Sequence, residues 1–159
     1  MVVGGSLVKY WTYRQICTQD NVAGGNLLAK VVAPAGCIMR PVACKMTASG
    51  TRAVGIWLAD PDGNIIQLAA CTAGAGANLT IPGIGTTPAT SGNYPDCTSL
   101  MGREFWFQVT TAAQTETATL QLHMLVYNAS SAPTVSWAGS GGTPNAAAAT
   151  DNTITAAIM

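Results

Sequence analysis

Short runs of alternating hydrophobic and polar residues recur along the chain, and Gly, Pro, Asn and Asp separate them. The runs are rich in Thr, Val, Ile and aromatic residues, and no long stretch keeps the period of an amphipathic helix. This pattern is typical of an all-β sandwich or barrel. Strands are expected near residues 6–17, 27–33, 37–48, 52–60, 64–71, 77–81, 103–111, 116–128 and 152–158.

The clearest turn signal lies in the segment "LADPDGNII", where Asp60, Asp62 and Asn64 alternate around Gly63. This spacing suits either a small calcium-binding loop or the bend of a hairpin. Pro61 fits the first corner of a type I turn, and Gly63 fits the left-handed position that closes a three-residue hairpin loop. A calcium loop of the EF-hand type also needs a later bidentate glutamate, which this segment lacks. The segment therefore predicts a hairpin turn and no metal site.

The hydrophobic pattern around this turn predicts the pairing of the two strands. One face is expected to hold the pairs Leu58–Ile66, Ile56–Leu68 and Val54–Ala70. The other face would hold Gly55, Trp57, Ala59, Ile65, Gln67 and Ala69. That second face carries no charge, so it is expected to be buried inside the domain or against a neighbouring subunit.

A second hairpin is expected over residues 103–128. One set of alternating residues is apolar and should face the core: Phe105, Phe107, Val109, Ala118, Leu120, Leu122, Met124 and Val126. The opposite set is neutral and polar or aromatic: Trp106, Gln108, Thr119, Gln121, His123 and Tyr127. Neutral polar faces with aromatic residues suit subunit contacts, because charge is costly to desolvate.

The length of 159 residues fits one domain with a real core. We expect a single β-sandwich over residues 1–129, with a long contact loop at 82–102 that is dense in Gly, Pro, Ser and Thr. Residues 130–159 are expected to form an extended C-terminal arm that contains Trp137.

The charge content is low, since 7 Lys and Arg balance 7 Asp and Glu and only 9% of residues are charged. Ordinary soluble domains carry about 25%, so much of the surface is expected to be covered by other protein. The lack of a basic block argues against nucleic-acid and anionic-membrane partners. No apolar run is long enough for a membrane span, and no secretory signal is evident, which predicts synthesis in a cytoplasm without export.

No motif for catalysis or for a cofactor stands out. His123 is the single histidine, no Cys or His residues have zinc-ligand spacing, and no G-x-S-x-G elbow occurs. The odd number of cysteines, five, favours small buried thiols, with one structural disulfide as the alternative. The aromatic group "YWTY" at 10–13 should divide between the core and a contact face, with a carbohydrate-stacking platform as the alternative.

The segments "AVGIWLADPDGNIIQLAA" and "TATLQLHMLVYNAS" resemble strands of small β-sandwich structural proteins of tailed-bacteriophage virions, the capsid decoration or cement proteins. The resemblance spans residues 36–128. It implies a jelly-roll-like domain that forms a homotrimer on the capsid surface of the virion and contacts the major capsid protein. It implies no catalytic, cofactor-binding or metal-binding residue, and the C-terminal arm would reach a neighbouring subunit or the shell.

Exposed aromatic and apolar residues in a charge-poor surface are the expected anchors of such contacts. The candidates are Trp57, Ile65, Tyr94, Trp106, His123, Trp137 and Ile158. Two other classes stay open: a receptor- or carbohydrate-binding module of a fibre or pilus, and a small hydrolase that would use His123. Another phage head or tail subunit is the remaining structural alternative.

Overall fold

The computed structural model describes residues 8–19, 25–49, 52–59, 65–74, 78–81, 101–112, 116–139 and 144–157. Side chains are described within these ranges except at positions 19, 25, 52–81 and 110–112. The strands are β1 (Val8–Gln19), β2 (Gly25–Val32), β3 (Ile38–Ala48), β4 (Arg52–Ala59), β5 (Ile65–Gly74), β6 (Asn78–Ile81), β7 (Glu104–Ala112), β8 (Thr117–Tyr127), β9 (Thr134–Gly139), β10 (Pro144–Ala146) and β11 (Asp151–Ala156). None of the described segments forms a helix long and apolar enough to span a membrane.

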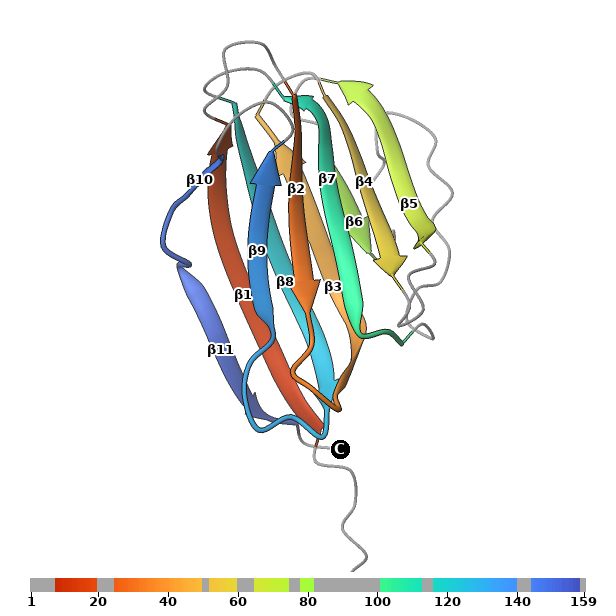
Figure 1. The fold of residues 1–159 in the computed structure, drawn as a ribbon, viewed down its shortest axis with the longest axis vertical. Helices are drawn as coiled ribbons and strands as arrows, with labels where there is room; N and C mark the ends of the chain where they lie inside the picture. The colour runs from red at the N-terminus through yellow and green to blue at the C-terminus, as the bar shows by residue number, and fades with distance from the viewer. Residues whose placement is uncertain are drawn as a thin grey trace, which may run out of the picture.

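Two antiparallel sheets pack face to face as a β-sandwich (Figure 1). The first sheet, here sheet A, has the order β10–β1–β8–β3–β6, and β11 also pairs with β1. The second, sheet B, has the order β5–β4–β7–β2–β9. Strand β1 therefore pairs with β8, β2 with β7, β3 with β6 and β4 with β5. This nesting of pairs across two sheets is the strand order of a jelly roll.

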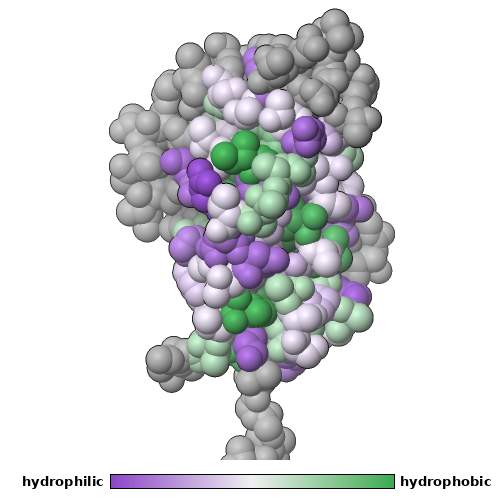
Figure 2. Space-filling view, turned by 90° about the vertical axis from the view of Figure 1, so that its left-hand side faces the viewer, coloured by the Kyte–Doolittle hydropathy of each residue, from purple (hydrophilic) through white to green (hydrophobic). Residues whose placement is uncertain are grey.

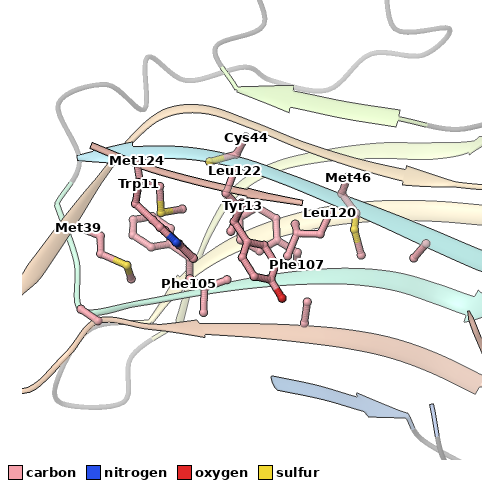
Figure 3. Close-up of a cluster of buried hydrophobic side chains, with 14 of the residues drawn as sticks. Trp11, Tyr13, Met39, Cys44, Met46, Phe105, Phe107, Leu120, Leu122 and Met124 are labelled. Atoms are coloured by element: carbon pink, nitrogen blue, oxygen red, sulfur yellow. The ribbon is translucent and has the colours of Figure 1, made fainter. Parts of the chain in front are cut away.

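The core lies between the sheets and follows the predicted alternation (Figure 3). In β8 every second side chain from Ala118 to Val126 is buried, and β7 buries Phe105, Phe107 and Val109. In β1 the side chains of Trp11 and Tyr13 are buried, whereas Tyr10 and Thr12 are partly exposed. The expected division of the aromatic group "YWTY" between core and surface is confirmed.

The predicted hairpin of 103–128 is wrong in its pairing, although its two faces are right. Strand β7 pairs with β4 and β2 in sheet B, whereas β8 pairs with β1 and β3 in sheet A. The apolar faces of β7 and β8 thus meet across the core instead of lying side by side in one sheet. Alternation reports which face of a strand is buried, but it does not report which strand lies beside it.

The pairing of β4 with β5 matches the predicted register only near the turn. Leu58 pairs with Ile66 and Trp57 with Gln67, as expected. A β-bulge between Ile56 and Trp57 then shifts the register by one residue, so Ile56 pairs with Ala69 and Val54 with Cys71. The extra residue of a bulge leaves no clear mark in the hydrophobic pattern. The turn residues 60–64 lie outside the described part of the chain.

Residues 130–159, expected as an extended arm, contribute strands to the sandwich. Strand β9 pairs with β2 in sheet B, while β10 and β11 pair with β1 in sheet A. Strands β10 and β11 lie beside β1 at one end of sheet A, and β9 lies beside β2 at the corresponding end of sheet B. The three C-terminal strands therefore lie together along one edge of the sandwich (Figure 1). Figure 2 looks onto this edge and shows small separate hydrophilic and hydrophobic patches.

Candidate interaction surface

The outer face of β8 is a row of partly exposed side chains without a formal charge. The strand lies in the middle of sheet A, between β1 and β3. Its outward positions are Thr117, Thr119, Gln121, His123, Leu125 and Tyr127, and His123 is the exposed one among them. The alternation that buries the apolar half of β8 therefore presents a neutral polar strip to the outside, as the sequence predicted.

His123 stands at the centre of this strip and contacts Tyr10 on β1. The hydroxyl of Tyr10 lies 2.7 Å from Nδ1 of His123, and the two rings meet edge to face with centroids 5.8 Å apart. In register, His123 is flanked by Thr12 on β1 and by Ala43 on β3. We call Tyr10, Thr12, Gln121, His123 and Leu125 the His123 surface.

One carboxylate borders the His123 surface on the β11 side. Hydrogen bonds from the side chains of Thr12 and then Thr153 lower the pKa of Asp151. Asp151 pairs in register with Arg14, whose guanidinium donates to Oγ1 of Thr150 at 3.2 Å. The negative charge therefore sits at the margin of the surface and is held there by hydroxyl groups.

Basic side chains flank the same surface along the neighbouring strands. The register places Arg14 and Lys45 on either side of Gln121. It likewise places Tyr10 and Arg40 on either side of Leu125. The described face of sheet A thus has a neutral centre with cationic side chains and the Asp151 carboxylate around it.

The outer face of sheet B carries Trp106, which contacts both members of the Lys30–Glu104 ion pair. The Trp106 indole N–H donates to Glu104, and the Lys30 ammonium lies 5.2 Å from the ring centroid. Lys30 also lies 3.0 Å from Oε1 of Glu104. Trp106 is partly exposed and pairs in register with Trp57 on β4, so the row of backbone positions from β4 to β2 reads Trp57, Trp106, Lys30.

Trp137 on β9 is partly buried against the core and joins the two sheets. Its Nε1 donates to Oε1 of Gln15 on β1 at 2.7 Å. The Tyr13 hydroxyl donates to the same oxygen, and Nε2 of Gln15 donates to the carbonyl of Ala147 at 2.7 Å. Gln15 was not among the predicted residues, and its signal in the sequence is a polar residue in the inward series of positions 11, 13, 15 and 17.

The remaining candidate contact residues are only partly placed or lie outside the description. Trp57 and Ile65 have known strand positions, and Ile65 pairs with Ala59, but their side chains are not described. Tyr94 and Ile158 lie outside the described residues. Of the predicted residues whose side chains are described, Trp106 and Trp137 lie on sheet B, whereas His123 lies on sheet A with Tyr10 as its aromatic neighbour.

The last group of candidates comprises the residues that could hold a metal ion or react as thiols. Within the described ranges, no group of three His, Cys, Asp or Glu residues could hold a metal ion. Cys17, Cys37 and Cys44 are buried and form no disulfide, as expected, while Cys97 and the side chain of Cys71 are not described. Burial raises the pKa of the Cys17 thiol to about 11, which keeps it protonated near neutral pH. Comparisons with known protein families, curated proteins and solved structures found no match.

Proposed function

We propose that this protein is a non-enzymatic structural subunit of a phage virion, a capsid decoration protein that binds the outside of the shell and associates with copies of itself. The observation that carries the proposal is the uncharged outer row of β8 with the exposed His123 at its centre. The jelly-roll strand order supports it by analogy alone, because viral capsid proteins and lectins both use this architecture.

The chemistry of the His123 surface suits a protein contact. Interface centres are depleted in charge, since an ion must lose its hydration when another protein covers it. Thr12, Gln121 and His123 offer hydrogen bonds at a lower desolvation cost, and Tyr10 adds an aromatic ring. The surrounding Arg and Lys side chains would orient a partner and raise its association rate.

The mechanism of such a subunit is mass action. A protein that binds the assembled shell and not its free parts shifts the equilibrium toward the shell. A homotrimer, the expected assembly, would multiply weak single contacts by attaching at several points. The expected partners are other copies of the chain and the major capsid protein, and the role requires no cofactor.

Charge insertion at His123 tests this proposal. A His123→Glu variant places a carboxylate in the neutral centre, and Ser131→Glu places one at an exposed position after β8 as the matched control. Both variants and the wild type are incubated with purified capsids of the phage that encodes the protein, and the capsids are then sedimented. We expect the wild type and Ser131→Glu to co-sediment and His123→Glu to stay in solution. Capsid binding by His123→Glu equal to that of the wild type would contradict the proposal.

A further inference from the structure

Within the described part of the chain, strand β11 is an edge strand of sheet A, and its composition is unusual for an edge. Among the described residues it pairs with β1 alone, and Figure 1 shows it at the outer margin of the sheet. It spans six residues, Asp151–Ala156, and contains no Lys, Arg or Pro and no bulge in its pairing with β1. Edge strands are normally protected by such features, because their unpaired backbone groups can bind another strand.

The hydrogen-bond pattern identifies which backbone groups of β11 point outward. The amide of Ala157 donates to the carbonyl of Val8 at 3.0 Å, in the same register that pairs Thr155 with Tyr10 and Thr153 with Thr12. In an antiparallel ladder, each residue directs its N–H and its C=O to the same side, and successive residues alternate between the two sides. The backbone N–H and C=O groups of Thr153 and Thr155 therefore face β1. The same groups of Asn152, Ile154 and Ala156 point away from it.

We infer that β11 pairs with β11 of a second copy of this chain and so joins two copies of sheet A into one continuous sheet. The antiparallel register that uses all the outward groups places Ile154 opposite Ile154 of the second copy. It also places Asn152 opposite Ala156 of that copy. Each copy supplies the same strand, so the contact has two-fold symmetry and closes at two chains.

The side chains and the charge of β11 agree with this self-pairing. In the proposed register Thr153 lies opposite Thr155 of the second copy, so hydroxyl groups meet hydroxyl groups, and Ile154 extends the apolar layer. Asp151 is the only charged residue of the strand, and it lies opposite Ala157 of the second copy. The two carboxylates are thereby kept at opposite ends of the contact, where like charges do not oppose each other.

This inference is independent of the capsid role and uses a different part of the molecule from the His123 surface. A two-fold contact cannot build a trimer by itself. If the proposed trimer forms through other surfaces, β11 links one trimer to another. Loss of this contact halves the native mass of a closed dimer or of a closed pair of trimers.

Amide hydrogen exchange on the wild-type protein tests the pairing without a substitution. The amides of Asn152, Ile154 and Ala156 should exchange quickly at low chain concentration and slowly at high concentration, because pairing follows mass action. The amides of Thr153 and Thr155 are the internal controls and should exchange slowly at both. Equally fast exchange of the three outward amides at every concentration would overturn the inference.

Two neighbouring proline substitutions provide the second test. Ala156→Pro removes an outward N–H and leaves the bonds to β1 intact, so we expect half the wild-type native mass and an unchanged unfolding temperature. Thr155→Pro removes an N–H that faces β1, so it should lower the unfolding temperature. A folded Ala156→Pro protein with the wild-type mass would refute self-pairing, and if this variant does not fold, the exchange result on the wild type decides.

Discussion

Trp137 on β9 donates a hydrogen bond of 2.7 Å to Gln15 on β1, and this bond ties an edge strand of sheet B to sheet A. Gln15 also accepts a hydrogen bond from the Tyr13 hydroxyl and donates one to the carbonyl of Ala147, just after β10. One side chain thus connects three parts of the sandwich edge. The C-terminal strands are held to the domain by this polar contact as well as by their backbone pairing.

We expect a Trp137→Phe variant to unfold at a lower urea concentration than the wild type. Phenylalanine keeps most of the ring packing against the core but removes the indole N–H, and the loss of one hydrogen bond costs about 1 kcal/mol. Gln15→Leu should cost more, about 1–3 kcal/mol, because it leaves the donors of both Trp137 and Tyr13 without this acceptor. Equal stability of Gln15→Leu and the wild type would show that this contact does not stabilise the edge.

Asn152 has a similar role for the fully buried Trp11. The Trp11 Nε1 donates to Oδ1 of Asn152 at 2.8 Å, so Asn152→Ala leaves a buried donor unsatisfied. We expect this variant to lose about 1–3 kcal/mol of unfolding free energy. Asn145→Ala, at an exposed position of β10, is the matched control and should stay within about 0.5 kcal/mol of the wild type. A similar effect of both substitutions in urea titrations would argue against a specific role for Asn152.

Stability should fall in alkaline solution because of two buried acidic groups in β1. Burial raises the pKa of Cys17 from its ordinary 9.0 to about 11, and that of Tyr13 from 10.0 to about 12. The unfolded chain then releases each proton at a lower pH than the folded chain does. Their contribution is complete below pH 9 and is lost as the pH rises through about 11 and 12.

Urea unfolding of the wild type and of Cys17→Ala between pH 8 and 11 measures this effect. The variant starts from a lower stability, since it lacks a buried side chain, but its stability should decline less steeply above pH 9. Parallel declines of the two proteins would show that Cys17 does not contribute to the alkaline loss.

The sequence predicted the faces of the strands better than their partners. Alternation placed Phe107 and Leu120 in the core correctly, because a strand buried on one face repeats every second residue. It could not show that β7 and β8 belong to opposite sheets, because pairing depends on contacts between distant segments. Strand β9 was missed because it is short and lies in a segment rich in Ser, Gly and Ala.

For the candidate surface, too, the sequence predicted which residues face outward but not which residues they contact. The outward position of His123 follows from the alternation of β8, whereas its contact with Tyr10 joins residues 113 positions apart and needed the pairing of β1 with β8. Trp137 was expected as a contact with another protein, and the structure places its indole N–H on Gln15 of the same chain. An aromatic residue in a polar segment indicates that its side chain packs against another surface. It does not indicate whether that surface belongs to the same molecule.

The most direct test of the central claim, that the charge-poor surface serves assembly, is the native mass of the purified protein by light scattering after size exclusion. With a chain mass of 16.2 kDa, we predict a discrete multiple of this value that persists as the concentration is raised. A monomer at all concentrations would contradict the claim that the neutral faces and the β11 edge are contacts between copies of the chain.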